Sequence, residues 1–140
     1  MSSIATQQAL IAYELITDEH PDVMVIEFLT SDILGPLQAR ELREQLDSLI
    51  SSGLPRNIVI DFRNARMLGS SAFGVIARFV RHVLRVRVCN INQSLRLGAS
   101  LIGLDECVEF ADSRESAVRA AIDDAMPSSE DTVDYPFATD

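Results

Sequence analysis

Residues 57–62, with the sequence Asn-Ile-Val-Ile-Asp-Phe, constrain the fold more than any other part of the chain. The run is short, nearly continuous in apolar residues and rich in β-branched side chains. Such strands are typical of parallel sheets, because helices cover both faces of the sheet and bury every side chain. The run therefore predicts a central strand of an α/β domain.

The segments on either side of this strand have helical periodicity. Apolar residues recur at mostly helical spacing through residues 31–52, and a second apolar stripe begins near Ser70. Ser31 or Asp32 is expected to cap the first helix, and Gly53 follows its end. A buried strand between two amphipathic helices is the repeating unit of α/β proteins.

The whole chain predicts the order β-β-α-β-α-β-α-β-α, in which the first two strands form a hairpin and the later strands run largely parallel. The expected fold class is α/β, a single domain with a mixed, mostly parallel sheet of about four to five strands covered by about four helices. Asp112 or Ser113 is expected to cap the last helix. The expected strands are residues 10–16, 23–29, 57–62, 86–89 and 108–111, and the expected helices are residues 31–52, 70–84, 92–104 and 112–124.

The length of 140 residues fits one domain, and the composition separates this domain from the C-terminal end. Residues 1–124 are the expected domain. Residues 125–140 are polar and without periodicity, so they are interpreted as a disordered acidic tail. Six acidic residues and no basic residue lie in residues 123–140, which therefore hold most of the net charge of −9.

This composition disfavours several classes of function. A net charge of −9 argues against a protein that binds nucleic acid through phosphate contacts, and all 12 basic residues are arginines, which excludes lysine chemistry. Cys89 and Cys107 lie far apart and are expected to be buried, in a reducing compartment, rather than to bind a metal. No apolar run is long enough to span a membrane, and the first residues do not resemble a signal peptide. We therefore expect a cytoplasmic protein.

Gly69, Ser70 and Ser71 begin the second helix and form the candidate regulatory site. Ser70 occupies the expected N-cap position, where its hydroxyl lies near free backbone N–H groups, and Gly69 permits a tight backbone before it. A phosphate on Ser70 would add a charge of about −1.5 to −2, which the positive end of a helix tolerates. A plain helix cap without further chemistry is the alternative.

Arginines further along this helix form a second candidate surface. Arg78, Arg81 and Arg85 are spaced to share one helix face, where they would offer guanidinium groups to an acidic partner. A solvated helix face is the alternative, and His82 is expected to be exposed. Asp61, at the end of the central strand, is expected to cap the following loop rather than to bind a ligand.

No group of residues in the sequence predicts catalysis. Ser70 has no recognisable general base beside it, and Gly98 and Gly103 do not form a phosphate-binding loop. We therefore expect a protein that is not an enzyme, with no catalytic residue, no metal and no cofactor.

The order of these segments resembles the STAS domain family (sulfate transporter and anti-sigma factor antagonist) over residues 11–124. The strand, polar link, pair of serines and apolar helix within residues 57–84 are similar to the central motif of the family, which is aspartate, serine, serine, glycine. Gly69 stands in place of the aspartate and Ala72 in place of the glycine. Later segments resemble the closing helix, short strand and terminal helix of the family, at residues 88–92, 94–96, 103–105 and 110–117.

The resemblance implies an anti-sigma factor antagonist of the stand-alone bacterial type. Such proteins bind an anti-sigma factor that is also a serine kinase. It further implies that the kinase phosphorylates Ser70, with Ser71 as the adjacent alternative, that this breaks the complex, and that a phosphatase reverses it. The partner-binding residues expected on this basis are Gly69, Ser70, Ser71, Phe73, Arg78 and Arg81.

Other readings stay open at this point. STAS-like domains also serve as accessory subunits of lipid transporter ATPases or as parts of signalling scaffolds, and Gly69 favours this reading because the carboxylate beside the hydroxyl is lost. A sensor of small molecules is a further alternative. The exposed edge of the first strand also allows a homodimer.

Overall fold

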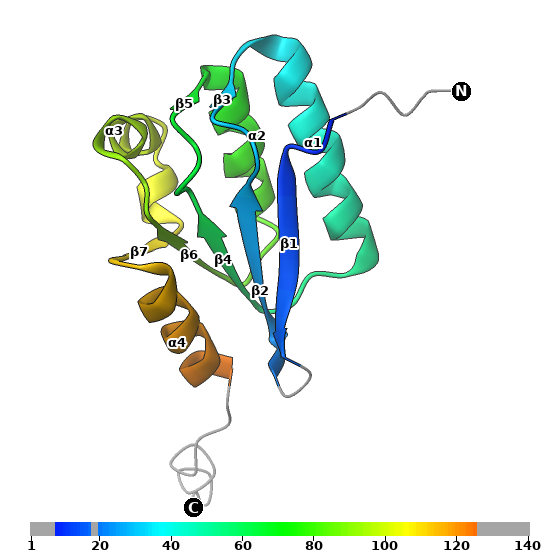
Figure 1. Ribbon diagram of the computed structural model, residues 1–140, viewed down its shortest axis with the longest axis vertical. Helices are drawn as coiled ribbons and strands as arrows, with labels where there is room; N and C mark the ends of the chain where they lie inside the picture. The colour runs from blue at the N-terminus through cyan, green and yellow to red at the C-terminus, as the bar shows by residue number, and fades with distance from the viewer. Residues whose placement is uncertain (1–7, 18–19, 126–140) are drawn as a thin grey trace, which may run out of the picture.

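A five-stranded sheet with the strand order β1-β2-β4-β6-β7 forms the centre of the computed structural model, which describes residues 8–17 and 20–125 (Figure 1). A second, two-stranded sheet pairs β3 with β5. The strands are β1 (Ile11–Thr17), β2 (His20–Phe28), β3 (Asp32–Ile33), β4 (Asn57–Asp61), β5 (Met67–Leu68), β6 (Arg85–Cys89) and β7 (Glu109–Ala111). The helices are α1 (Gly35–Ser52), α2 (Ser70–Val80), α3 (Gln93–Leu101), the short 3₁₀ helix η1 (Leu104–Glu106) and α4 (Arg114–Ala125).

β4 lies in the middle of the large sheet, as its apolar sequence predicts. All of its residues are buried, and it is parallel to both neighbours, with Val25 of β2 and Arg87 of β6 beside Val59. β1 is antiparallel to β2, so the sheet is mixed and mostly parallel. The predicted α/β fold class is therefore confirmed, and so is the hairpin of the first two strands.

Helices cover both faces of this sheet. α1, α2 and α3 contribute to the core on one face, and α4 lies on the other face (Figure 1). The side chains of β4 alternate between the two sides, so that Ile58 and Ile60 lie in the larger core and Val59 packs with Ala117 and Ala121 of α4. A buried central strand flanked by helices explains why the run showed no polar alternation.

The start of α1 differs from the prediction. The helix begins at Gly35, and neither Ser31 nor Asp32 caps it. Both residues instead take part in pairing with the chain around β5, because the Ser31 carbonyl accepts a hydrogen bond of 2.6 Å from the N–H of Arg66, and Asp32 lies beside Met67. Two strands of two residues each are too short to produce a sequence pattern, and so the small sheet was missed.

The ends of α2 and α3 also differ from the prediction. α2 ends at Val80, and Arg85 begins β6 instead of continuing the helix. α3 ends at Leu101, because Gly103 takes a left-handed conformation with φ of 79° and starts the separate helix η1. A glycine in this conformation ends helices at little cost, and the apolar periodicity alone could not locate that break.

The last helix is capped as predicted, by the second of the two expected residues. The Ser113 hydroxyl accepts a hydrogen bond of 3.0 Å from the N–H of Ser116, and α4 then runs to Ala125. The acidic tail predicted for residues 125–140 lies outside the described residues from position 126 onward. Cys89 is buried as expected, but Cys107 is exposed, because it follows η1 at the surface rather than lying in a strand.

Candidate functional site

The first turn of α2 presents the predicted serines at the surface. Gly69 is the N-cap residue, with φ −75° and ψ 170°, and Ser70 is the first residue of the helix. The expectation that Ser70 caps the helix and that Gly69 supplies a tight turn is therefore wrong, because the backbone at Gly69 is ordinary extended chain. Ser70 and Ser71 are both exposed, and no side chain caps this helix. The Ser70 hydroxyl is consequently free for another role.

The small sheet fixes where this helix begins. β3 and β5 are parallel, with Ile33 beside Leu68, and the Gly69 N–H continues the pairing with a 2.9 Å hydrogen bond to the Ile33 carbonyl. α1 and α2 each start directly after this sheet, so their N-terminal ends lie at the same end of the molecule (Figure 1). The first turn of α2 is thus held by the backbone, although its serine side chains are not.

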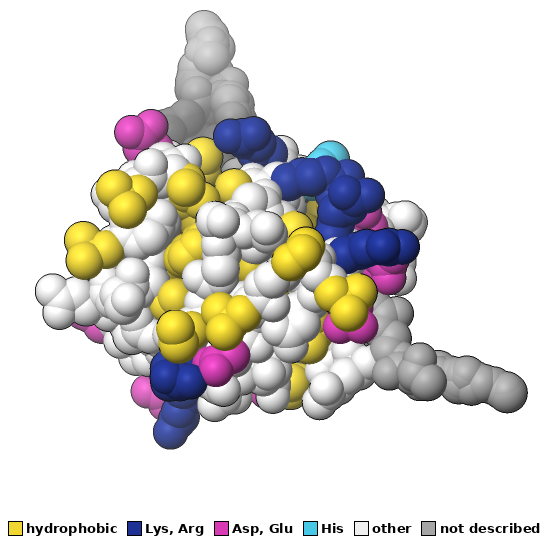
Figure 2. Space-filling view, turned by 90° about the horizontal axis from the view of Figure 1, so that it is seen from above, with side chains coloured by type: hydrophobic (Ala, Val, Ile, Leu, Met, Phe, Trp, Pro, Cys, Tyr) yellow, Lys and Arg dark blue, Asp and Glu magenta, His cyan; other side chains and the backbone are white. Residues whose placement is uncertain are grey.

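Exposed apolar side chains lie around this end of the molecule. Figure 2 shows hydrophobic side chains gathered over the face where β3, β5 and the starts of α1 and α2 lie. Leu97 and Leu101 of α3 are 61% and 87% exposed, and α3 is held beside the first turn of α2 by the close approach of Gly98 to Phe73. We call this surface the apolar end face, and its residues are Leu34, Leu37, Met67, Leu97, Leu101 and Ile102. Single exposed apolar residues are common, but a group of this kind marks an interaction surface.

The structure separates the predicted partner-binding residues into three environments. Gly69, Ser70 and Ser71 lie together at the start of α2, beside the apolar end face. Phe73 is only 7% exposed and belongs to the core, so it supports the helix from inside and offers no contact surface. Arg78 and Arg81 lie toward the other end of α2, about 12–17 Å along the helix axis from Ser70.

The predicted stripe of three arginines on α2 does not form. The Arg78 guanidinium lies 2.7 Å from the Asp47 carboxylate of α1, and Arg81 follows the last residue of α2. Arg85 belongs to β6 and pairs with Glu109 at 3.1 Å. The helical spacing that suggested a common face ended before Arg85, and the sequence carried no glycine or proline to show it.

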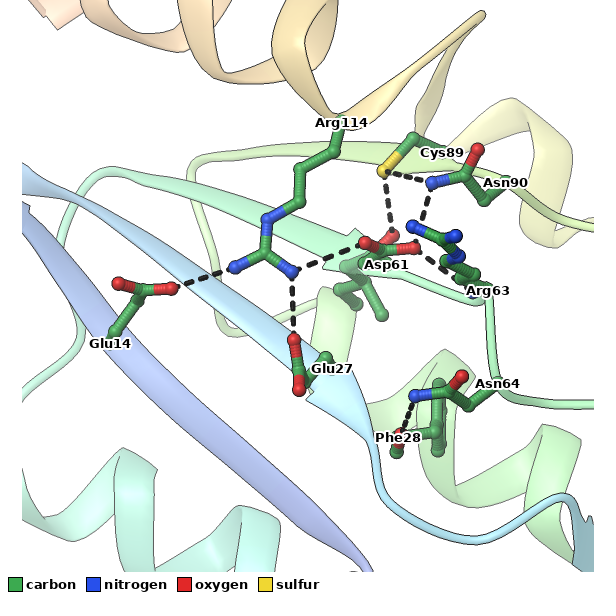
Figure 3. Close-up of polar contacts among 10 residues, drawn as sticks. Glu14, Glu27, Phe28, Asp61, Arg63, Asn64, Cys89, Asn90 and Arg114 are labelled. Carbon is green, nitrogen blue, oxygen red and sulfur yellow. Dashed lines mark hydrogen bonds and ion pairs between the residues drawn. The ribbon is translucent and has the colours of Figure 1, made fainter.

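A polar cluster that the sequence did not predict lies at the carboxyl ends of the central strands. Figure 3 shows the Arg114 guanidinium among three carboxylates. It pairs with Glu14 of β1 and Glu27 of β2 at 2.7 Å each and with Asp61 of β4 at 3.3 Å. The hydrogen bond to Glu27, more than any other interaction, raises the pKa of Arg114. One arginine at the start of α4 therefore joins that helix to three strands.

Asp61 has the predicted role as a loop cap in addition to this ion pair. Its Oδ1 accepts a hydrogen bond of 2.9 Å from the N–H of Arg63 and one of 3.0 Å from the Asn90 amide. Asn90 has φ of 58°, a left-handed conformation that asparagine tolerates better than most residues. Burial, followed by the charge of Asp61, raises the pKa of the neighbouring Cys89 to about 12. Cys89 is thus a protonated thiol in this cluster.

The cluster has the chemistry of a structural joint. Its carboxylates all face one guanidinium, which neutralises them in place. Nowhere in residues 8–17 and 20–125 do three His, Cys, Asp or Glu side chains group as metal ligands would. The interactions of Glu14, Glu27, Asp61 and Arg114 come from four different elements, and only the fold brings them together.

The fold and the surface serine define a class of protein, a small α/β domain with a mixed sheet and an exposed serine where its second helix starts. The model of the family described as STAS domain matches residues 14–117, and the chain belongs to this family. The predicted family is thereby confirmed. No curated protein sequence matches the chain.

Solved structures of anti-sigma factor antagonists have the same fold. The phosphorylated form of the Bacillus cell fate determinant SpoIIAA is 21% identical over 79% of this chain and 98% of its own, with a TM-score of 0.57. An anti-sigma factor antagonist from Mycobacterium paratuberculosis is 18% identical over 79% of this chain and 93% of its own, with a TM-score of 0.63. RsbS from Moorella thermoacetica is 16% identical over 74% and 89%, with a TM-score of 0.54. Separately, no helix among the described residues is long and apolar enough to cross a membrane.

Proposed function

We propose that this protein is an anti-sigma factor antagonist that acts by binding and not by catalysis. The observation that carries the proposal is an exposed serine, Ser70, at the first position of α2 and beside the apolar end face. The likeness of the fold to SpoIIAA and to the Mycobacterium antagonist supports the same role. The partner is an anti-sigma factor with serine kinase activity, and a phosphatase completes the cycle.

The apolar end face supplies the binding energy in this proposal. Burying one exposed leucine side chain against a partner yields about 1.5–3 kcal/mol. Leu97 and Leu101 are the most exposed leucines of the face next to Ser70, so a partner that covers the serine also covers them. Most of this gain offsets the entropy lost on association, and the remainder sets the affinity.

A phosphate on Ser70 reverses this binding without unfolding the domain. The free N–H groups at the start of α2 and the helix dipole tolerate a charge of about −1.5 to −2. The same charge must be desolvated when an apolar partner surface covers it, and this cost is absent for a neutral serine. A difference of about 5.5 kcal/mol is enough to change a complex from almost fully formed to almost fully dissociated.

Affinity purification from the native host tests the proposal. The tagged full-length protein is incubated with the proteins that co-elute and with ATP, and its intact mass is then measured. We expect one added phosphate, which Ser70→Ala abolishes and Ser71→Ala preserves. Ser70→Glu should reduce recovery of the partner strongly, whereas Ser71→Ala serves as the matched control at the neighbouring exposed position.

The apolar end face is tested separately from the phosphate. Leu101→Glu places a charge on the most exposed leucine of the face, where it should leave the free energy of unfolding within about 0.5 kcal/mol of the wild type. We expect it to abolish recovery of the kinase while Leu84→Glu, at an exposed leucine outside this face, does not. Equal binding by both variants would place the partner elsewhere on the molecule.

Gly69 supports a second candidate function, an accessory or scaffold STAS subunit without phosphorylation. The family motif has an aspartate at this position, and the chain has no carboxylate there. Under this alternative Ser70→Ala and Ser70→Glu bind the partner equally, and the co-eluting protein is a transporter ATPase or a scaffold component. The same purification therefore separates the two functions.

A further inference from the structure

A groove lies along α4, on the face of the sheet opposite to α2. It has a volume of about 750 Å³ and is open to solvent. Its lining combines two half-buried apolar residues one helical turn apart, Val118 and Ile122, with polar and charged side chains. The remaining lining residues are Arg63, Asn90, Ser113, Arg114, Glu115 and Arg119.

Two of the arginines in this groove differ from the other one. The Arg114 guanidinium is neutralised by three carboxylates. Arg63 and Arg119 are exposed and form no ion pair with any residue in the described part of the chain. Glu115 also lines the groove, so the unpaired charges there are two positive and one negative. The groove is therefore a positively charged strip with an apolar floor in a protein whose net charge is −9.

The chain itself contains a segment of complementary chemistry that starts beside this groove. Residues 126–140 carry the acids Glu130, Asp131, Asp134 and Asp140, the aromatic residues Tyr135 and Phe137, and no base. They follow Ala125, the last residue of α4, which is three positions beyond Ile122. Fifteen extended residues span about 50 Å, whereas the twelve residues of α4 measure about 18 Å. The segment is long enough to turn back along the whole groove.

We propose that residues 126–140 dock in the groove of α4 within the same molecule. Their carboxylates pair with Arg63 and Arg119, and an aromatic side chain covers Val118 and Ile122. Guanidinium groups suit this pairing because they bind carboxylates through two parallel hydrogen bonds. The direct covalent connection gives an effective concentration in the millimolar range, so weak contacts suffice. This interaction is independent of the proposed partner site, which lies on the other face of the sheet.

A single tryptophan reports on the docking, because the chain has none of its own. Phe137→Trp is introduced into the full-length protein, and its fluorescence emission is compared at low and high salt. We expect emission shifted to shorter wavelength at low salt, and a shift to longer wavelength when Arg63 and Arg119 are both changed to glutamate. Arg56→Glu is the matched control, because Arg56 is exposed and does not line the groove.

Charge reversal and a measurement without tryptophan complete the test. Asp131→Arg with Asp134→Arg should restore the short-wavelength emission in the protein that carries both glutamates. In the otherwise unaltered chain, replacing the four acids of residues 126–140 by their amides should shift the backbone NMR signals of Val118, Arg119 and Ile122 and leave those of α2 unchanged. Emission typical of water under all conditions, together with unchanged NMR signals, would overturn the proposal. Emission that depends on protein concentration would overturn it too, since the segment would then dock on a second copy.

Discussion

Gly98 is the residue at which α3 comes closest to α2. A Cβ atom at this position would lie 2.8 Å from two ring carbons of Phe73, which is itself buried. Gly74 in α2 is different, because a Cβ atom there would have no neighbour within 4 Å. The two helical glycines therefore have opposite roles. Gly98 permits the contact that places Leu97 and Leu101 beside the first turn of α2, whereas Gly74 only weakens its helix.

We predict opposite effects of alanine at these two glycines. Gly74→Ala should raise the free energy of unfolding by about 0.5–1 kcal/mol, the usual gain in helix propensity. Gly98→Ala should lower it by about 1 kcal/mol or more, because displacing a packed ring costs about 1–3 kcal/mol and exceeds that gain. Urea unfolding of both variants measures the difference. Stabilisation by both would show that the Phe73 ring moves aside freely.

Gly69 tests whether the missing carboxylate can be restored. A Cβ atom there would lie 3.7–3.8 Å from the backbone of Ile33, Leu34 and Gly35, which is ordinary contact, and φ of −75° suits any residue. Gly69→Asp should therefore fold normally and raise the stability by a few tenths of a kcal/mol, since aspartate is a good N-cap residue. In the phosphorylation assay it should leave the phosphate on Ser70. A loss of more than about 1 kcal/mol would mean that the turn requires glycine.

At the scale of elements, α4 is attached to the sheet by one buried charge cluster and a small apolar contact. Its buried apolar residues are the alanines Ala117 and Ala121, which bury little area compared with the leucines of α1. Arg114 adds ion pairs to three strands at the start of this helix. The charge cluster therefore contributes to the specificity of the docking of α4 as well as to its stability.

The carboxylates around Arg114 should contribute unequally. The Asp61 side chain is 4% exposed and that of Glu14 is 61% exposed. Asp61→Asn should cost about 1–3 kcal/mol, the usual range for a buried hydrogen bond to a charged group, whereas Glu14→Gln should cost less than about 0.5 kcal/mol, as for exposed ion pairs. The midpoints of urea unfolding give both values. Equal costs would show that burial does not set the strength of these pairs.

At the scale of the whole molecule, Cys89 reports on global opening. It lies at the end of β6, between the sheet and α4, and is fully buried, whereas Cys107 is exposed. We predict that a thiol reagent labels only Cys107 in the folded protein and labels both cysteines in denaturant. Fast labelling of Cys89 under native conditions would indicate that α4 separates from the sheet without global unfolding.

The raised pKa of Cys89 also predicts how stability changes with pH. Its pKa is about 12 in the folded protein and has an ordinary value of 9.0. The folded state therefore holds this proton more tightly, and the resulting stability is complete below pH 9 and is lost as the pH rises toward 12. Cys89→Ala should flatten this part of the curve of unfolding free energy against pH. An unchanged slope in the variant would assign the loss of stability to other groups.

The sequence by itself determined the layers of this protein and the order of its elements. Residues 57–62 predicted a buried central strand, and the helical spacing around them predicted the α/β class, because burial on one or both faces imposes a periodicity that can be read locally. The resemblance that placed Ser70 at the start of a helix used the same local pattern. These features depend on neighbours along the chain.

The tertiary structure alone decided where distant residues meet. The pairing of β3 with β5, the apolar end face and the cluster of Glu14, Glu27, Asp61 and Arg114 all join segments far apart in sequence. Arg78 and Arg85 shared a helical spacing, yet one pairs with α1 and the other begins a strand, because the helix ends where its core contacts end. Contacts between distant segments leave no periodicity in the sequence, and so only the packed chain reveals them.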